Sequence, residues 1–248
     1  MLVSKNSSDY FARSESGGKG YNLYLMQQEG IAIPDWVILG KSVYAEFMEK
    51  GGILHAINKL TQAFQDGVLP ARQLSDGIER LIVETPLPGD IVRLVNEAYA
   101  RVCAGGMISV RSSALDEDGS AHSFAGQLSS YLYVSSAADA ARFMKLCWAS
   151  AYSDRSIAYR VQNRLSLSDI SVAVIFQKML EPDVSGVMFT CDPAITREVV
   201  NLFHHLTGYS REPGFERLLV APINMRERFI ELIRREVIVD YRPGAGIR

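Results

Sequence analysis

The chain has 248 residues, of which 48% are hydrophobic, and its formal net charge is -2. This apolar content excludes a disordered chain, and 26 basic against 28 acidic residues exclude a broad basic surface for nucleic acid or a polybasic membrane anchor. The three cysteines are far apart and fit neither a disulfide framework nor a metal-ligand spacing. We therefore expect a globular protein whose thiols are buried and reduced.

The N-terminal residues, MLVSKNSSDYFARSES, are polar and lack the apolar core of a signal peptide. No run of the sequence approaches the roughly 18 apolar residues that a membrane-spanning helix needs. We therefore expect a cytoplasmic protein with neither a membrane nor a nucleic-acid partner.

The first hundred residues predict mainly helices. Apolar residues recur at helical spacing from Gly20 to Glu29, and Gly30 supplies a stop. Ser42 is the predicted N-cap of a helix over 42–50. The other elements of this part are a short apolar strand at 36–39 and amphipathic helices at 53–66, 71–84 and 89–103.

The pattern changes after Gly105-Gly106, where strands become frequent. Strands are predicted at 107–113, 128–134, 170–180, 184–191 and 237–239, and helices at 136–150, 153–163, 196–206 and 223–235. The fold class is therefore α+β, with helices early and strands later. We divide the chain into a mainly helical N-terminal part (1–127), a β-rich lobe (128–193) and a divergent helical tail (194–248).

The first candidate for chemistry is the segment Ser16-Gly-Gly-Lys-Gly20 at the entrance to a helix. Glycines allow close backbone approach, and a helix N-terminus offers free N–H groups and a partial positive charge. Lys19 adds a point charge suited to phosphate. The segment lacks the Walker spacing, so a Gly-rich entry to a surface helix is the alternative.

The second candidate begins with Arg111 and Ser112, which end a predicted strand and suit phosphate oxygens. The small-residue segment from Gly119 to Gly126 could fold over a ligand as a lid. Its acidic neighbours, Asp116 to Asp118, have no distant residue to complete a metal site, which favours a solvated loop.

The third candidate is Arg155, in the first turn of the helix that Ser153 or Asp154 can cap. A cation at this position opposes the helix dipole unless an anion lies nearby, which favours a functional role. The fourth is a pair of strands, 174–179 and 185–190, that could wall a nucleotide pocket. Gln177 would read the adenine edge and Met179 would pack on its face, although a Met in a strand is more often a core residue.

The order and wording of these segments resemble the N-terminal ATP-binding domain of phosphoenolpyruvate synthase and pyruvate phosphate dikinase. The resemblance covers about residues 16–193 and rests on long motifs in one order. They are Gly17-Gly-Lys-Gly-Tyr-Asn-Leu23, Gly30-Ile-Ala-Ile-Pro-Asp-Trp-Val37, Val110 to Ala114, Glu117-Asp118, Ser123 to Gln127, Trp148 to Ser150, Arg155 to Arg160, Val174 to Leu180 and Ser185 to Pro193.

The resemblance implies an ATP-grasp type of fold and the use of ATP with Mg²⁺. It implies that Lys19 and Arg111 bind the ATP phosphates, that Arg155 reaches the terminal phosphates in catalysis, and that Gln177 lies beside the adenine. The segment Gly119 to Gln127 would be the phosphate lid. The candidate cofactor-binding residues are Lys19, Arg111, Ser112, Gly126, Gln127, Gln177 and Met179.

Departures from the family pattern begin after Pro193. The family continues to a Gly-Leu-Gly-Glu segment and to acidic magnesium ligands before a Gln-x-Arg-Pro strand, whereas this chain has Val239-Asp-Tyr-Arg-Pro243 without the Gln. Neither Glu236 nor Asp240 is assigned as a metal ligand. We therefore expect an incomplete ATP-grasp fold that lacks the metal-binding lobe. The phosphohistidine motif of the family is also missing from the sequence.

The leading hypothesis is that the chain is the ATP-binding portion of a dikinase-like phosphotransferase, whose phosphate passes to a histidine or substrate on a partner domain or chain. The alternative is a degenerate, non-catalytic module of the same fold, which senses nucleotide or binds a protein. A third arrangement is a homo-oligomer in which the tail, with the apolar face of 223–235, completes a shared site.

Overall fold

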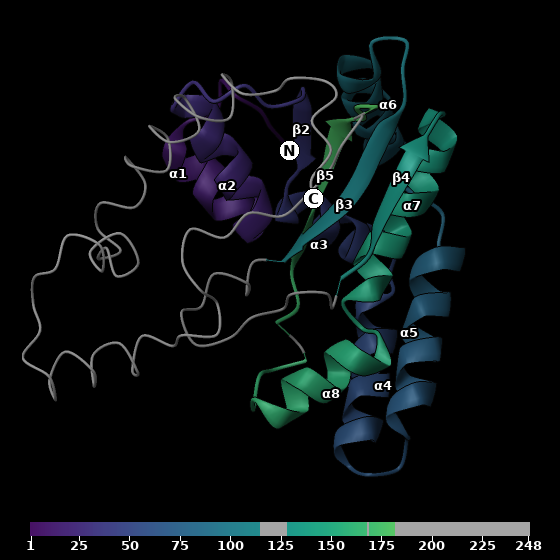
Figure 1. Cartoon of the computed structure of the whole chain (residues 1–248). Coiled ribbons are helices and arrows are strands. Elements are labelled where there is room, and N and C mark those ends of the chain that lie inside the picture. The colour runs from purple at the N-terminus through teal and green to yellow at the C-terminus, as the bar shows by residue number, and fades with distance from the viewer. Residues whose placement is uncertain (115–127, 168, 182–248) are drawn as a thin grey trace, which may run out of the picture. The chain divides into compact units, whose positions relative to one another are not determined.

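The computed structural model describes residues 1–114, 128–167 and 169–181, and helices pack on both faces of one sheet (Figure 1). Residues 1–181 form a single compact unit. Within the described ranges, no helix combines the length and the apolar character needed to cross a membrane. The structure therefore confirms a mixed helix-and-sheet fold.

The sheet has five strands in the order β1-β2-β5-β3-β4, and every neighbouring pair is antiparallel. Their bounds are β1 (Leu2–Val3), β2 (Trp36–Leu39), β3 (Ile108–Ala114), β4 (Ser130–Val134) and β5 (Val172–Lys178). The last strand in sequence thus lies at the centre, between β2 and β3. Strands from both sides of residue 127 share this one sheet.

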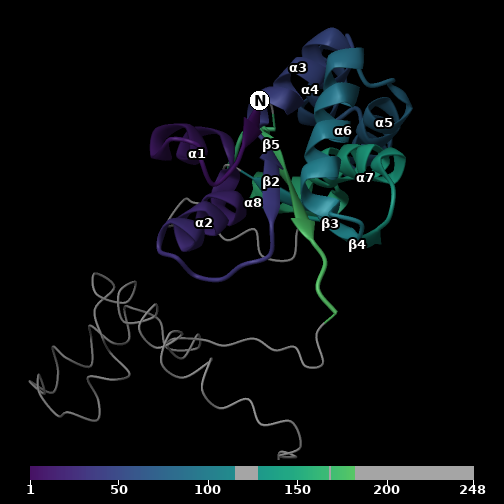
Figure 2. The same cartoon turned by 90° about the horizontal axis from the view of Figure 1, so that it is seen from above.

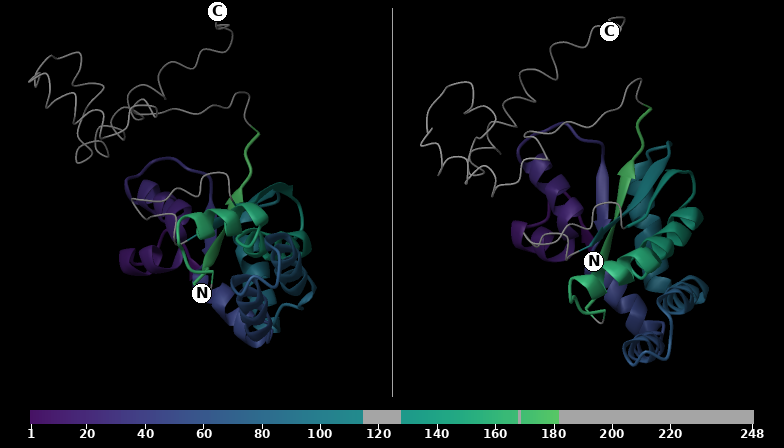
Figure 3. Two further views of the ribbon diagram at one scale, coloured as in Figure 1. Left: turned by 90° about the horizontal axis from the view of Figure 1, so that it is seen from below. Right: turned by 60° about the horizontal axis from the view of Figure 1, so that its bottom comes forward.

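The helices cover the sheet in two groups, with α1 and α2 on one face and α6 and α7 on the other (Figure 2). In the second group α4 and α5 lie side by side, and α8 packs against α5 (Figure 3). The bounds are α1 (Asp9–Glu15), α2 (Gly17–Gln28), α3 (Lys41–Lys50), α4 (Leu54–Gln65), α5 (Ala71–Glu84), α6 (Gly89–Cys103), α7 (Ala137–Ser150) and α8 (Asp154–Gln162).

The central strands are buried on both faces because each face is covered by helices. In β2, Val37 and Leu39 join the larger core with α3 to α8, whereas Trp36 and Ile38 join the smaller core with α1 and α2. Successive side chains of a strand point to opposite faces, so a continuous apolar run such as Trp36–Leu39 fills two cores at once.

Several predicted elements agree closely with the structure. The helices predicted at 71–84 and 89–103 are α5 and α6 without a shift, and the strand predicted at 36–39 is β2. The predictions at 184–191, 196–206, 223–235 and 237–239, and the predicted phosphate lid from Gly119 to Gln127, lie outside the described residues.

The structure corrects the start of two helices. The predicted cap at Ser42 is wrong, because α3 begins at Lys41 with Gly40 as its N-cap. The Ser42 N–H instead donates to a Glu15 carboxylate oxygen at 3.0 Å, which ties the end of α1 to the start of α3. The helix predicted from Gly20 begins at Gly17, and the sequence patterns did not predict α1 and β1.

Candidate nucleotide-binding site

The first turn of α2 rests directly on the end of β3. Gly17 has a φ of +64°, and a Cβ placed on it would lie 2.6 Å from the carbonyl oxygens of Ser113 and Ala114. The Gly20 N–H donates to Ser113 Oγ at 3.1 Å. Only glycine fits such an approach with a positive φ, which explains Gly17. At Gly20 the packing is also close, because a Cβ there would lie 2.8 Å from the Ile38 side chain.

Lys19 lies in this first turn and is half-buried, at the end of α2 where backbone N–H groups lack intrahelical acceptors. Ser16 immediately precedes the helix and is fully buried. Among the described residues its hydroxyl has no hydrogen-bond partner, although buried polar atoms in proteins nearly always have one. An orphaned hydroxyl and a cation therefore meet at this helix end.

Arg111 and Gln177 are brought together by the pairing of β3 with β5. The Arg111 guanidinium donates to the Gln177 side-chain oxygen at 3.1 Å. In the register Gln177 lies opposite Ser109, so the contact with Arg111 is diagonal. The Ser109 hydroxyl also donates to the Gln177 carbonyl, at 3.3 Å. Gln177 is buried and Arg111 is half-buried.

These side chains lie on the same face of the sheet as α2. Ser113 contacts α2, and Arg111 lies two positions before it on the same strand. Ile175, two positions before Gln177, belongs to the core that α1 and α2 form with the sheet. Lys19, Arg111 and Gln177 are thus presented from three elements to one side of the sheet.

Ser112 has a different environment. Its hydroxyl donates to the Ser129 carbonyl at 2.8 Å, and its side chain is buried on the face opposite Arg111. Met179 follows β5, is half-buried, and its N–H donates to the Met107 carbonyl at 2.9 Å. Nucleotide contacts of Ser112 and Met179 stay predictions, and Gly126 and Gln127 lie outside the described residues.

Arg155 is exposed in the first turn of α8, as the sequence predicted. Ser153 is the N-cap, since its hydroxyl accepts from the Ser156 N–H at 3.3 Å. The structure therefore unites Arg111 with Gln177 and docks the α2 turn on Ser113, while Arg155 comes from a separate helix that packs on α5.

A buried polar network behind α8 was not predicted from the sequence. The Tyr44 and Tyr152 hydroxyls lie 2.8 Å apart in the core, and burial raises the pKa of both phenols. Arg160 is also buried and donates to the Ser166 carbonyl at 2.7 Å. The first contact joins α3 to the connection between α7 and α8, and the second joins α8 to the segment after it. No local sequence pattern marks them.

Comparison with known proteins identifies the domain. The family model of the pyruvate phosphate dikinase AMP/ATP-binding domain matches residues 13–208. A probable phosphoenolpyruvate synthase of Archaeoglobus fulgidus is 37% identical over 182 residues, which cover 71% of this chain and 24% of that protein. A probable phosphoenolpyruvate synthase of Methanothermobacter thermautotrophicus is 32% identical over 185 residues, 72% of this chain and 27% of the relative.

A rifampicin phosphotransferase of Streptomyces sviceus matches more of this chain. It is 31% identical over 228 residues, which cover 91% of this chain and 26% of the relative. The chain thus spans about a quarter of the length of these relatives. It belongs to the family of the pyruvate phosphate dikinase AMP/ATP-binding domain and corresponds to the ATP-binding part of a phosphoenolpyruvate synthase-like phosphotransferase.

Proposed function

We propose that the chain binds ATP on the sheet face that carries Lys19, Arg111 and Gln177, and presents its terminal phosphates for transfer. The observation that carries this proposal is the docking of the α2 first turn on Ser113, beside the Arg111–Gln177 pair. Helix N–H groups and an arginine directed to one side of a sheet suit a chain of phosphates.

The residues present fit such a group. A guanidinium has five donors, so Arg111 can hold Gln177 and phosphate oxygens together. The buried Ser16 hydroxyl would gain the acceptor that it lacks among the described residues. Gln177 and Met179 would border the adenine, with Ser112 supporting the end of β3. Arg155 would act on the terminal phosphates, since charge neutralisation dominates phosphoryl transfer.

Mg²⁺ belongs to the proposal as the ion that accompanies the triphosphate. Within the described part of the chain, no group of three His, Cys, Asp or Glu side chains could hold a metal. In this proposal the ion accompanies ATP and would neutralise its phosphates. The acceptor of the phosphate, a histidine or a substrate, would lie on a partner domain or chain.

Calorimetric titration with ATP and Mg²⁺ tests nucleotide binding. Lys19→Ala and Arg111→Ala should each weaken binding by about tenfold or more, because each removes a charged hydrogen-bond donor. Lys59→Ala, which removes an exposed cation on α4, is the matched control and should leave binding unchanged. No heat of binding up to millimolar nucleotide would refute the proposal for this chain.

The second candidate function is a non-catalytic nucleotide-sensing or protein-binding module. The observation that favours it is the sequence after Pro193, which lacks the Gly-Leu-Gly-Glu segment and the paired carboxylates of the family that the chain resembles. A release of phosphate from ATP that disappears in Arg155→Ala would exclude this candidate. Binding of ATP with no turnover, alone and with a partner chain, would favour it.

A further inference from the structure

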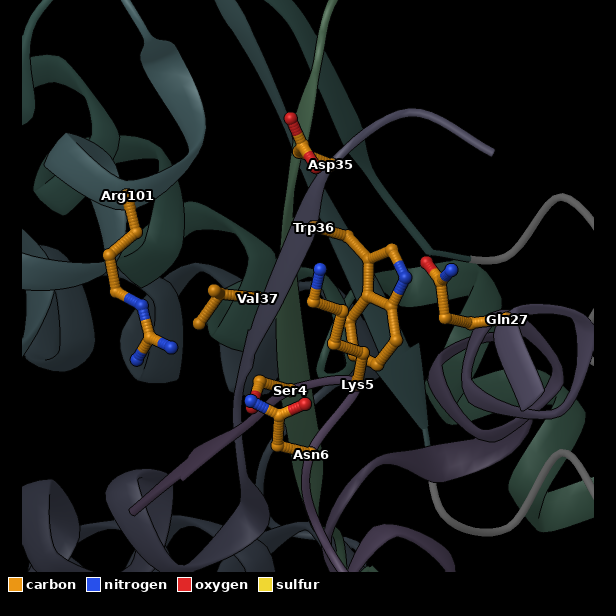
Figure 4. Close-up of a pocket in the computed structure, with 8 residues that line it drawn as sticks. All are labelled: Ser4, Lys5, Asn6, Gln27, Asp35, Trp36, Val37 and Arg101. Carbon is orange, nitrogen blue, oxygen red and sulfur yellow. The ribbon is translucent and has the colours of Figure 1, made fainter. Parts of the chain in front are cut away.

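A pocket lies at the opposite edge of the sheet from β4, where β1 leaves β2 (Figure 4). Its volume is about 190 Å³, which is several times the roughly 30 Å³ that one water molecule occupies in the liquid. Its floor is formed by the buried Trp36 and Val37, and its rim includes Lys5, Asn6 and Arg101. These residues come from the segment after β1, from β2 and from α6.

The pocket exists because β1 is only two residues long. Leu2 pairs with Leu39 and Val3 with Ile38, and the chain then diverges at Ser4. Hydrogen bonds of an antiparallel strand alternate between its two neighbours. The Asp35 carbonyl accepts from the Lys178 N–H, on the β5 side. The Gly40 N–H donates to the Met1 carbonyl, on the β1 side.

This alternation turns the main chain of Trp36 toward the edge that β1 has left. Within the described ranges, neither β1 nor a side chain supplies a hydrogen-bond partner for its N–H or C=O. The edge therefore presents a main-chain donor above a buried indole. Such a donor is costly to leave without water or a ligand.

Two cations flank this donor. The Lys5 side chain extends beside Trp36, and the Arg101 guanidinium lies on the other side of Val37 (Figure 4). Arg101 gives one contact, of 3.4 Å, to the Glu97 carboxylate and keeps further N–H groups. The Asp35 carboxylate points away from both cations in this view. The centre of the pocket thus offers donors and positive charge.

We propose that this pocket binds a small oxyanion, a carboxylate or phosphate group, whose oxygens accept hydrogen bonds from the Trp36 main chain, Lys5 and Arg101. Ionised acceptors and cationic donors form the stronger class of hydrogen bonds, and the pocket volume suits a few non-hydrogen atoms. The pocket opens at the β1 edge of β2, whereas Trp36 pairs with Gln177 across β2 and β5, so it borders the proposed nucleotide site from the other side of β2. The proposal concerns anion binding in the absence of ATP.

The test is a titration of the ¹⁵N-labelled full chain, followed by the NMR signals of the Trp36 backbone and indole N–H groups. Trp36→Phe assigns the indole signal, because Trp148 is the only other tryptophan. Inorganic phosphate and succinate are added separately, without nucleotide, at constant ionic strength. We expect saturable shifts with a dissociation constant on the order of 1 mM for at least one of the two anions.

Paired variants decide whether the pocket is responsible. The double variant Lys5→Gln/Arg101→Gln should lower the affinity for the anion by about tenfold or more. Lys59→Gln with Arg80→Gln removes the same charge from exposed positions on α4 and α5, and should bind as the wild type does. All four side chains are exposed, so folding should be retained, and the ligand-free spectra check this.

Two outcomes would overturn the assignment. Shifts that rise linearly with both anions would show an adventitious ion only, and equal binding by the two paired variants would place the anion elsewhere. Lys19→Ala separates this site from the proposed nucleotide site, because it should leave phosphate and succinate binding unchanged. If the wild-type chain binds the anion but binds no ATP, the proposed function fails and the oxyanion site stands.

Discussion

The Arg111 guanidinium donates a hydrogen bond to the side-chain oxygen of Gln177, across β3 and β5, from a position 66 residues earlier in the chain. It joins the residue predicted to bind phosphates to the residue predicted to lie beside the adenine. The bond holds the arginine in place while most of its N–H groups stay available. The two proposed halves of the nucleotide site are therefore mechanically coupled.

The first prediction follows from this coupling. Gln177→Leu keeps the approximate size of the side chain but removes the acceptor that orients Arg111. Affinity for ATP, measured by calorimetry, should fall by about tenfold, the equivalent of one hydrogen bond to a charged group. Gln73→Leu, at an exposed position of α5, is the control. Unchanged affinity in Gln177→Leu would separate Gln177 from the proposed site.

The second prediction concerns the glycine that seats α2 on the sheet. Gly17→Ala places a methyl group 2.6 Å from two carbonyl oxygens at a φ of +64°. Gly67 has a similar φ of +72° with nothing within 4 Å, so Gly67→Ala isolates the backbone strain, about 1–2 kcal/mol. Urea unfolding should show a clearly larger loss for Gly17→Ala. Equal losses would contradict the close packing of α2 on β3.

The third prediction concerns the buried tyrosine pair. Tyr44→Phe removes the hydroxyl that lies 2.8 Å from that of Tyr152, and Tyr152→Phe does the converse. Each variant should lose about 1–3 kcal/mol of unfolding free energy, because a buried hydroxyl loses its partner. The double variant should lose less than the sum, by at least about 0.5 kcal/mol. Additive losses would show that the hydroxyls do not interact.

The fourth prediction is a loss of stability at alkaline pH. Burial raises the pKa of the Cys147 thiol from 9.0 to about 12, so the unfolded chain releases this proton first. The resulting stabilisation is complete below about pH 9 and is lost as the pH rises toward about 12, at up to about 1.4 kcal/mol per pH unit.

Urea unfolding across that pH range, in the wild type and in Cys147→Ala, measures this contribution. The variant should show the shallower decline, because Tyr44 and Tyr152 ionise in both proteins. Cys103→Ala removes a half-exposed thiol at the end of α6 and should keep the wild-type slope. Parallel curves for wild type and Cys147→Ala would contradict the prediction.

The sequence alone predicted the elements whose signals are local. The bounds of α5 and α6 follow from apolar residues at helical spacing, and β2 follows from a short apolar run. The start of α3 was misplaced because its first turn is completed from α1, by the Glu15 carboxylate on the Ser42 N–H. A cap supplied by a distant residue leaves no mark at the helix itself.

For the candidate site, the chemistry of single residues is visible without a structure: Lys19 and Arg111 carry positive charge, and Gly17 permits close backbone approach. The tertiary structure was needed to learn that β5 enters between β2 and β3, which joins Arg111 to Gln177, and that the Ser112 hydroxyl bonds the Ser129 carbonyl. It also decided that β1 ends early and leaves the Trp36 edge open. The physical reason is that strand pairing and the choice of face depend on segments far apart in the chain, which local spacing does not encode.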